Sequence, residues 1–520
     1  MLGRRDNQIK FSSIESWCAK PVVPEDSFYG RLAQWGERLV RDEDFAEMYA
    51  GTGRPSNSPA LLAKVLLLMY YDDVSDREAE ERARYDLRWK HALGLDLDET
   101  GFDHTNLCRF RSALLLHNKE RLVFERFINL ALEAGILKTK NVTHIIDSTH
   151  VLGAGAVQDT YTMIKSAVRK ALRVTRNNHK LHGRLRNVLS DLDYDKPGKP
   201  KIDWEDPEAR RTLVTQLVRD AQAVQETLAA AGDELDSEQQ AALDLLATIT
   251  LQDVRPGEGG TYEIEKGVAK DRTISTTDPE MRHGRKSKHG RFDGHKLQVV
   301  TDLDSELITN VKVTPGNGAD KEALPEVVTE QAVKPDTLIG DTAYGSADTR
   351  VKMAQEQVKV IAPAPKASAK KNRFSKDEFV IDLENKTCTC PAGQVTAKLK
   401  KRLFTFDRQT CNVCPLRDQC TEHGRGRTIR LHEHEPVIQK ARQEQKTEEF
   451  KAVYSQRALG ERKISDMVRH GARVARYIGR TKTEVQMIFT AAVVNLKRLS
   501  RLFDTDEKAR VGISVSLGLG

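Results

Sequence analysis

Two short strand-like segments, each ending in an aspartate, constrain the fold of this 520-residue chain more than any other feature. Residues 142–146 are rich in β-branched side chains and lead into Asp147, and residues 337–340 lead in the same way into Asp341. An aspartate at a strand end can be an ordinary turn former. Because the two aspartates lie far apart in the sequence, their carboxylates can meet only if both strands are neighbours in one sheet.

The elements around these segments predict a mixed sheet. A long helical stretch follows the first strand, and two alternating runs over 295–301 and 307–313 predict a hairpin. A helix beginning between Asp320 and Pro325, a helix over 346–357 and a strand over 358–362 complete the order. Without the helical insertion, this order approximates an α/β fold with the mixed sheet of ribonuclease-H-like proteins. His295 is expected at a strand edge.

The N-terminal region predicts short helices. Ser58-Pro59 has the form of a helix start, residues 75–78 have the form of a capping box, and Thr105-Asn106 opens a third helix that carries Arg109 and Arg111. Connected short helices with basic residues on the last one fit a helix-turn-helix-like DNA-binding module. A plain helical bundle is the alternative, and these residues alone favour it.

Basic segments lie between the two aspartates. Residues 161–190 are strongly basic and helical in pattern, and residues 207–253 predict two amphipathic helices split near Gly232. Residues 282–296 carry six lysines and arginines against one aspartate. A basic helix is usually a solvated surface. Because acidic residues do not balance the first segment, a surface that faces phosphate groups is the alternative.

Neighbouring carboxylates indicate metal-dependent chemistry on phosphodiester bonds. Two carboxylates repel each other unless cations lie between them, and hard oxygen ligands favour Mg²⁺ or Mn²⁺. Two such ions about 4 Å apart can activate an attacking hydroxyl and stabilise the leaving oxygen at phosphorus. Such a site usually needs a third carboxylate, for which Glu461 is the best candidate.

Glu461 has two companions at helical spacing. Tyr454, Arg457 and Glu461 stand at i, i+3 and i+7, so on one continuous helix all three share a face. An aromatic ring, a guanidinium and a carboxylate in a row suit a face that binds metal at one end and a DNA backbone along its length. An exposed ion pair between Arg457 and Glu461 is the alternative for these residues taken alone.

Five of the seven cysteines lie close together in the sequence, at Cys388, Cys390, Cys411, Cys414 and Cys420. A two-plus-two arrangement of thiolates suits tetrahedral Zn²⁺, and residues 398–407 between the pairs predict a hairpin, as in a zinc ribbon. The first pair has one spacer residue instead of two, and five cysteines compete for four positions. Cys390, Cys411 and Cys414 are the best ligand candidates, and free buried thiols are the alternative.

Three segments resemble the catalytic segments of bacterial insertion-sequence DDE transposases of the group that carries a Y-R-E-K signature. They are Asp147 in Ile-Ile-Asp-Ser-Thr, Asp341 in Ile-Gly-Asp-Thr-Ala-Tyr-Gly-Ser, and Tyr454-x2-Arg457-x3-Glu461. The resemblance continues over residues 53–59, 276–279, 294–298 and 483–498. One position departs from the signature, because its final lysine would fall at Val468, with Arg469 beside it as a substitute.

The resemblance implies an enzyme that cuts DNA at element ends and joins them to target DNA, with water and then a 3′-hydroxyl as nucleophiles. Asp147, Asp341 and Glu461 would hold the metal ions, Tyr454 and Arg457 would position DNA, and Arg469 would contact phosphate. The partners would be double-stranded DNA and a second copy of the chain in a homodimer. Two alternatives are a metal-dependent DNA nuclease without strand transfer and a DNA-binding protein without catalysis.

Composition argues against several classes of protein. The chain has no run of 18 apolar residues, which argues against a membrane span, and residues 1–6 lack the apolar core of a signal peptide. The crowded cysteines are unlike a secreted disulfide framework, and Cys18 and Cys108 are expected to be structural. We therefore expect a cytoplasmic protein, which the resemblance places at the nucleoid of a bacterium.

The length predicts about three domains. We expect a helical N-terminal DNA-binding domain over residues 1–135 and a ribonuclease-H-like catalytic domain over residues 136–380 and 436–505. A helical insertion over about 157–280 interrupts the catalytic domain, and a small zinc-ribbon-like insertion occupies residues 381–435.

Overall fold

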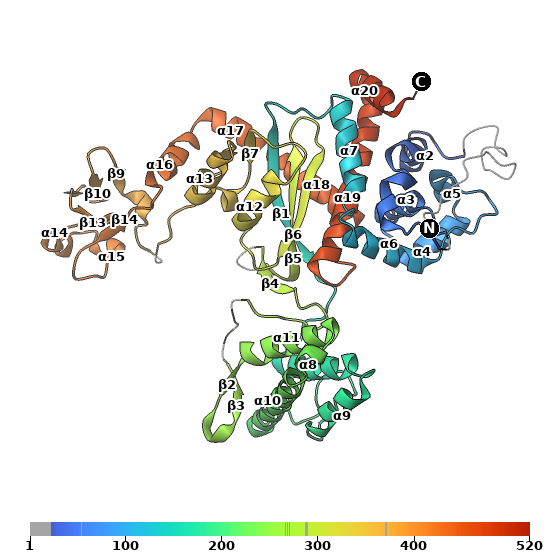
Figure 1. Ribbon diagram of the computed structural model, residues 1–520. Coiled ribbons are helices and arrows are strands. Elements are labelled where there is room, and N and C mark those ends of the chain that lie inside the picture. Colours follow the sequence, from blue (N-terminus) through green and yellow to red (C-terminus); the bar gives the residue numbers. More distant parts are fainter. Residues whose placement is uncertain are drawn as a thin grey trace.

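The computed structural model describes residues 22–519, except 54, 266, 268, 270, 287–289, 370 and 371. Figure 1 shows a central sheet flanked by helices, a helical body below the sheet and a small body rich in short strands at the left. Helices and strands of mixed direction both contribute, so the predicted α/β class is confirmed. Cys18 lies outside the described residues.

Six strands within the described residues form the central sheet. Their order is β4 (Arg282–Arg285), β5 (Arg291–Asp302), β1 (Thr143–Leu152), β7 (Thr337–Ile339) and β8 (Lys359–Ile361), and β6 (Ile308–Pro315) also pairs with β5. β5 is antiparallel to β1, β4 and β6, whereas β1, β7 and β8 run parallel. The predicted β5–β6 hairpin and the predicted pairing of the two aspartate strands are both confirmed.

The two faces of the sheet pack against different helices, because successive side chains of a strand point to opposite sides. Ile146 and Val300 pack with residues of α12 (Asp320–Thr329) and α13 (Ala347–Gln355). Val151 and Val299 belong to the larger cluster that contains α7 (Leu122–Glu133) and α19 (Arg480–Thr505). Both faces of the sheet are therefore covered, as Figure 1 shows.

The start of α12 differs from the expectation that proline would lie in the first turn. The helix begins at Asp320, which places Pro325 in the second turn. Leu324, Val327 and Val328 are buried against the sheet. This burial holds the helix together despite the hydrogen bond that proline cannot donate.

The N-terminal helices share one hydrophobic core with α19. Ser58 caps α3 and Ser75 caps α4, as the sequence predicts, whereas α5 was not predicted. Cys108, expected to be structural, is exposed on α6. The elements are α2 (Phe28–Leu39), η1 (Asp42–Met48), α3 (Pro59–Tyr71), α4 (Asp76–Tyr85), α5 (Leu87–Leu93) and α6 (His104–Leu116), followed by α7.

Arg111 on α6 joins helices instead of presenting charge to solvent. The side chain is buried, its Nη1 donates to Asp76 Oδ1 at 2.9 Å, and its guanidinium lies 4.7 Å from the centre of the Tyr477 ring. Arg109 on the same helix is exposed. The structure therefore leaves one of the two arginines of the predicted DNA-binding face available.

The insertion between β1 and β4 forms a helical body with its own hydrophobic cluster. The predicted basic helix and the two predicted amphipathic helices are present, and a short β2–β3 hairpin that was not predicted follows them. The elements are α8 (Thr160–Val174), α9 (His179–Asn187), α10 (Pro207–Ala229), η2 (Gly232–Glu234), α11 (Ser237–Gln252), β2 (Val254–Pro256), η3 (Glu258–Gly260) and β3 (Tyr262–Ile264).

The cysteine-rich segment forms two small three-stranded sheets. The hairpin predicted over 398–407 is present as β12–β13, with Leu399 opposite Phe404. The elements are η5 (Lys376–Glu378), β9 (Val380–Asp382), β10 (Thr387–Thr389), β11 (Val395–Thr396), β12 (Leu399–Lys400), β13 (Leu403–Thr405), α14 (Arg408–Asn412), α15 (Arg417–Cys420) and β14 (Thr428–Arg430).

The chain returns to the sheet through a series of helices. They are α16 (Glu435–Glu444), α17 (Glu448–Ser455), α18 (Ala458–Met467), the π-helical turn η6 (Val468–Ala472), α19 and α20 (Glu507–Leu517). The breaks predicted near Gly471 and Gly479 are both present, and both glycines have positive φ angles. No helix in the described part of the chain is long and apolar enough to cross a membrane.

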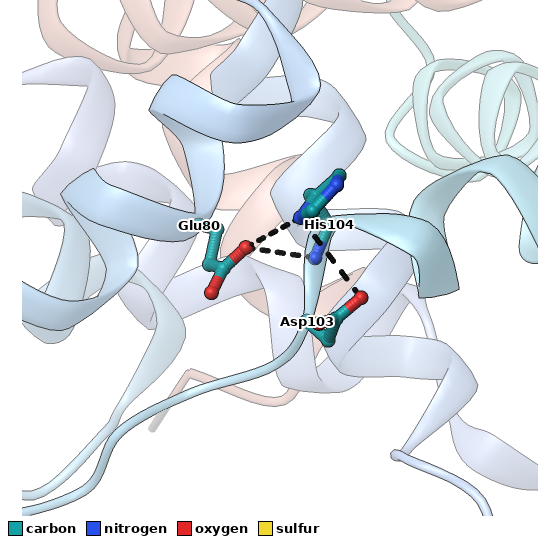
Figure 2. A group of neighbouring side chains, drawn as sticks. All are labelled: Glu80, Asp103 and His104. Atoms are coloured by element: carbon teal, nitrogen blue, oxygen red, sulfur yellow. Dashed lines mark hydrogen bonds and ion pairs between the residues drawn. The ribbon is translucent and has the colours of Figure 1, made fainter.

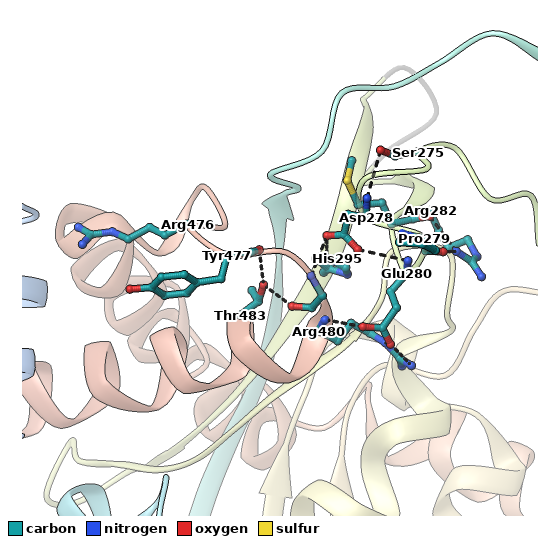
Figure 3. A network of polar contacts seen from close by, with 12 residues as sticks. Ser275, Asp278, Pro279, Glu280, Arg282, His295, Arg476, Tyr477, Arg480 and Thr483 are labelled. Carbon is teal, nitrogen blue, oxygen red and sulfur yellow. Dashed lines mark hydrogen bonds and ion pairs between the residues drawn. The ribbon is translucent and has the colours of Figure 1, made fainter. Parts of the chain in front are cut away.

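A buried polar network fixes the start of α19 against the sheet (Figure 3). The Asp278 carboxylate accepts a hydrogen bond from Gly479 N at 3.1 Å and lies 3.4 Å from His295 Nε2. Glu280 accepts hydrogen bonds from Arg480 N and Nε at 2.8 and 2.9 Å. His295 is fully buried and not at a strand edge, because its strand pairs with β1 at Val151 and with β6 at Pro315.

Candidate active site

Asp147 lies on β1 with only 14% of its side chain exposed. Its Oδ1 accepts a hydrogen bond from Ser148 N at 2.9 Å, and its Oδ2 lies 3.5 Å from Arg457 Nη1. Burial raises the pKa of Asp147 to about 6, with a further upward contribution from the negative charges of Asp341 and Glu461, whereas Ser148 N and Arg457 act to lower it. The three carboxylates are therefore close enough to interact.

Asp341 reaches the same region from the neighbouring strand. Its Oδ1 accepts a hydrogen bond from Ala343 N at 2.8 Å and so caps the short helix η4 (Thr342–Tyr344). Ile339 at the end of β7 pairs in parallel with Ile145, two residues before Asp147. Asp147 itself lies in the middle of β1, which continues to Leu152, so the strand end predicted there is wrong. Asp341 follows this pairing by two residues, as Asp147 does on β1, so both aspartates lie just beyond the point where β7 ends.

Glu461 is supplied by α18, which packs closely against β1. Gly460 permits this approach, since a Cβ atom at that position would lie 2.9 Å from Ile145 Cγ2 and 3.4 Å from Asp147 Cβ. Glu461 itself is 58% exposed and forms an ion pair with Arg457. One guanidinium thus contacts two of the three carboxylates.

These groups line a single cavity of about 590 Å³. Acidic, basic and hydroxyl side chains all contribute to it. Its lining consists of Asp147, Ser148, Thr149, His150, Arg285, Lys286, Phe292, Lys296, Asp320, Asp341, Arg457, Glu461, Ile464, Ser465, Val468 and Arg473. The cavity therefore combines a carboxylate cluster, suited to cations, with a basic wall, suited to phosphates.

Two polar groups of this cavity were not identified from the sequence. Asp320 is a fourth carboxylate, and its Oδ1 accepts hydrogen bonds from Lys296 Nζ at 3.1 Å and Gln298 Nε2 at 3.0 Å. Arg473 donates from Nη1 to Thr149 Oγ1 at 2.9 Å and to His150 O at 2.8 Å. Burial and the charges of Arg473 and Lys286 lower the pKa of His150. The local sequence around neither Asp320 nor Arg473 indicates this position in the cavity.

The comparison with protein-family models matches three stretches of the chain. Residues 17–113 match a model described as Transposase domain (DUF772), and residues 266–386 and 385–500 match two models described as Transposase DDE domain. The chain belongs to the DDE transposases. Asp341 and Glu461 lie within the matched stretches, whereas Asp147 lies between them. No curated protein and no solved structure matches the chain.

In this transposase, Tyr454, Arg457 and Glu461 do not lie on one continuous helix, contrary to the expectation from their spacing. α17 ends at Ser455 and α18 begins at Ala458. The backbone between them makes i to i+3 hydrogen bonds, such as Arg457 N to Tyr454 O at 3.0 Å and Gly460 N to Arg457 O at 2.9 Å. Because such a turn is tighter than an α-helix, it changes the face on which each residue lies.

Tyr454 therefore lies beside the carboxylate cavity and not in its lining. Its ring stacks on Phe450, with centroids 5.6 Å apart, and packs at the margin of the cluster formed by Ile145, Ile339 and Leu459. The phenol is half-buried. This position leaves the ring accessible from the side of α17.

Arg469 does not take the place of the signature lysine in the cavity. Val468 lines the cavity, but the π-helical turn η6 directs Arg469 elsewhere, where its Nη1 lies 3.2 Å from Asp466 Oδ1 and its side chain is 74% exposed. Arg469 lines a separate basic cavity with Arg462, Lys497, Arg498 and Arg501 among other residues. The cation that the transposase presents to the carboxylate cavity from this region is Arg473.

A separate acidic group lies on the N-terminal helices (Figure 2). Ligand atoms of Glu80, Asp103 and His104 all lie within 4.8 Å of one another. Asp103 Oδ1 accepts from Thr105 N at 2.8 Å, and Glu80 Oε2 accepts from His104 N at 3.0 Å and contacts His104 Nδ1 at 2.8 Å. These hydrogen bonds fix the start of α6 against α4, so the group has a structural role.

The cysteines of the transposase divide into two environments. Cys390, Cys411, Cys414 and Cys420 line one cavity of about 430 Å³, whereas Cys388 does not line it. Cys388 is buried among Phe379, Phe404 and other apolar residues, and burial raises the pKa of its thiol to about 11. All five are free thiols. Within the described residues, no three of these sulfur atoms all lie within 4.8 Å of one another.

Proposed function

We propose that the protein is a DNA transposase of an insertion sequence that cuts DNA at element ends and joins them to target DNA by two-metal phosphoryl transfer. The observation that carries the proposal is the convergence of Asp147, Asp341 and Glu461 on one cavity with a basic wall. Carboxylates from a strand, a strand end and a helix meet there, although they are distant in the sequence. The family supports this function, since DDE models match the chain.

The residues of the cavity fit Mg²⁺ or Mn²⁺. The donor set consists of carboxylate oxygens, which hard divalent cations prefer. Burial and, to a smaller extent, Asp341 and Glu461 raise the pKa of Asp147, so a cation beside it would favour its charged form. Asp147, Asp341 and Glu461 would hold the ions, and Asp320 lies in the same lining. When bound, such ions supply activation of the attacking hydroxyl and stabilisation of the leaving oxygen.

The side chains of the chain itself account for DNA positioning. Arg285, Lys286 and Arg473 present positive charge to a phosphate in the cavity, and Arg457 offsets the carboxylates until a cation binds. Tyr454, at the margin, is available to stack against a nucleotide of end or flanking DNA. Arg469 would contact phosphate from the separate basic cavity. No covalent link between protein and DNA is needed.

We further propose that the sheet and its helices form a ribonuclease-H-like catalytic domain over residues 136–380 and 436–505. The supporting observation is the order of an antiparallel hairpin beside parallel strands that carry two of the acids. The N-terminal helices would form the DNA-binding domain over 1–135, and residues about 157–280 and 381–435 the two insertions. The transposase would act as a homodimer on double-stranded element ends, at the nucleoid.

The cysteine cavity is proposed as a structural Zn²⁺ site in a ribbon-like fold. Cys390, Cys411, Cys414 and Cys420 supply four thiols around one cavity, which is the number that tetrahedral zinc requires. Cys388 would be the cysteine left out of this site, which is supported by its position in the apolar core.

The proposal is tested with end-labelled element DNA incubated with protein and Mg²⁺ or EDTA. We expect Mg²⁺-dependent cleavage at the element ends and, with target DNA present, joined products. Asp147→Asn, Asp341→Asn and Glu461→Gln should each abolish both, whereas Asp304→Asn, an exposed turn residue paired with Lys138, should retain both. Cleavage without joined products would instead identify a nuclease, and equal behaviour of all variants would identify a protein that only binds DNA.

A further inference from the structure

A further basic cavity, of about 510 Å³, lies where the helical insertion meets the rest of the chain. Its lining includes α8, which belongs to the helical body below the sheet in Figure 1, residues between Arg186 and Gly198 of the same insertion, and three segments from outside this body. These are residues 156–158 after β1, Thr276 and Thr277 before β4, and Ile478 before α19. The cavity is distinct from the carboxylate cavity, since the two linings share no residue.

The wall from α8 is a stripe of hydroxyl and guanidinium groups. Thr162, Ser166, Arg169, Arg173 and Arg176 follow one another at intervals of three or four residues, so they share one side of the helix and the turn after it. The three arginines are exposed. Within the described residues, none of the three guanidinium groups forms a hydrogen bond or an ion pair.

The charge on this wall is only partly balanced from outside the stripe, since Asp195 in the same lining interacts with Arg176 as well as with Arg186. Lys170 also lines the cavity, and its pKa is lowered by burial and by Arg173, with Glu238 acting in the opposite direction. Arg186, a further lining residue, is paired with Asp195. Four cations on one short helical segment therefore repel each other, and a bound anion would relieve that repulsion.

The walls are held in place by hydrogen bonds. Gln158 donates from Nε2 to Ser166 Oγ at 3.0 Å and accepts from Thr276 N at 2.9 Å and Thr276 Oγ1 at 2.8 Å. Two residues further on, Asp278 is bound to Gly479 N in the network of Figure 3. The insertion, the segment before β4 and the start of α19 are thus joined around the cavity, so the stripe has a fixed orientation.

The two cavities border the same two segments of chain. β1 carries Asp147 in the first cavity and continues through Leu152, which bridges to Val474, to residues 156–158 in the second. The segment after η6 carries Arg473 in the first cavity and Ile478 in the second. A DNA strand presents a phosphate about every 3.4 Å, so a duplex cut in the first cavity offers further phosphates to neighbouring surfaces.

We propose that the α8 cavity binds backbone phosphates of duplex DNA beside the cut site, which makes the helical insertion a DNA-holding element. This inference rests on the proposed function for its ligand, because it takes the DNA to be the substrate of the neighbouring carboxylate cavity. Guanidinium and hydroxyl groups contact phosphates without reading base edges, so the contact is independent of base sequence. The contact increases the affinity for DNA and fixes the position of the duplex relative to the protein.

The test measures binding of fluorescent element-end DNA in EDTA, by anisotropy at several salt concentrations. The triple variant Arg169→Gln, Arg173→Gln, Arg176→Gln removes three charges from the stripe. We expect affinity to fall about 10- to 100-fold at 0.1 M salt and the slope of log affinity against log salt to decrease by about 2 to 3. The corresponding triple lysine variant should keep most of the slope, because it keeps the charge.

The matched control is Arg210→Gln, Arg211→Gln, Arg219→Gln, which removes three charges from α10, outside the cavity lining. It should bind like wild type, and circular dichroism should show equal helix content in all variants. Equal affinity and slope for the α8 and control variants would overturn the inference. Mg²⁺-dependent cleavage by the wild type is measured separately. If the wild type does not cleave but the α8 variant alone loses DNA affinity, the proposed function fails and the inference about the α8 cavity holds.

Discussion

Arg457 contacts both Asp147 and Glu461, so in the metal-free protein one guanidinium offsets part of the negative charge of the cavity. Burial nevertheless raises the pKa of Asp147 to about 6, against an ordinary value of 3.8, with a smaller upward contribution from Asp341 and Glu461. A carboxylate whose pKa is raised by folding lowers stability as the pH rises from its unfolded pKa to its folded pKa, and the full cost is present above the folded pKa. At neutral pH the cavity therefore destabilises the empty protein, and a divalent cation would remove that cost.

This charge balance predicts a pH-dependent stability difference between wild type and Asp147→Asn in EDTA. The native state binds the extra proton between pH 4 and 6, so wild-type stability falls as the pH rises through this window, by up to about 3 kcal/mol. Asp147→Asn lacks the titrating group and should unfold at a higher temperature than wild type at pH 7.5, with little difference near pH 4. Thermal unfolding at both pH values checks this. A variant less stable than wild type at pH 7.5 would contradict it.

Arg473 and Arg469 give a second prediction at this scale. Arg473 lines the carboxylate cavity, whereas Arg469 lies outside it and is mostly exposed. Arg473→Ala should reduce Mg²⁺-dependent cleavage about 10- to 100-fold, the range expected for one lost charged hydrogen bond. Arg469→Ala should have a much smaller effect. Single-turnover cleavage rates of the two variants test this prediction. A larger loss in Arg469→Ala than in Arg473→Ala would mean that Arg469 fulfils the role of the signature lysine.

Among the elements, the contact between α18 and β1 determines where Glu461 lies. Gly460 is the point of closest approach, and a Cβ atom there would lie too close to Ile145 to be accommodated without movement. The glycine precedes the carboxylate directly, so any displacement of the helix also displaces Glu461. The packing of one helix turn on one strand is thus coupled to the geometry of all three acids.

Gly460→Ala is predicted to impair cleavage more than stability. Misplacing a catalytic group by about 1 Å can cost about 10²-fold in rate, so a loss of that order is expected. Gly183→Ala is the matched control, because a Cβ atom on that α9 glycine meets nothing within 4 Å. Cleavage rates and thermal midpoints of both variants are compared with wild type. Unchanged cleavage by Gly460→Ala would show that α18 tolerates the shift.

The sequence predicted helices and strands more accurately than it predicted tertiary contacts between them. The alternation over β5 and β6, the caps Ser58 and Ser75, and the β-branched runs before Asp147 and Asp341 are local signals, and each led to the correct element. The predicted end of the first strand was wrong, because β1 continues through Asp147 to Leu152. The turn at Gln456 and Arg457 was missed, because helical spacing continues through it. Asp320 and Arg473 were missed because only tertiary packing brings them to the cavity. Their local sequences carry no sign of it.

At the scale of the whole molecule, hydrophobic burial is divided among separate clusters. The helical insertion has its own cluster, and the cysteine-rich body has another around Phe379, Phe404 and Ile429. The latter is small, so few apolar side chains stabilise it. A structural metal is the usual supplement for a body of this size. Loss of such a metal should therefore loosen this body and leave the main core intact.

Chelation supplies the fourth prediction. A zinc chelator should increase hydrogen exchange over residues 380–430 while exchange in the sheet and α19 stays unchanged, because their core is separate. Cys411→Ser and Cys414→Ser should reproduce the effect and lower the zinc content measured by mass spectrometry. Cys108→Ser, on the exposed face of α6, is the control. Full zinc content in Cys414→Ser would exclude that thiol as a ligand.

The distance in sequence between β1 and its partners has a consequence for how the protein is made. At ribosomal rates of 5–20 residues per second, Asp341 emerges roughly 10–40 s after Asp147, and Glu461 later still. The helices of the insertion, whose contacts are local, can fold before the strands that pair with β1 have been synthesised. A nascent chain therefore carries a folded insertion before it carries a complete set of acids. In the proposed function, cleavage would become available only after Glu461 has been synthesised, so shorter nascent chains would leave DNA uncut.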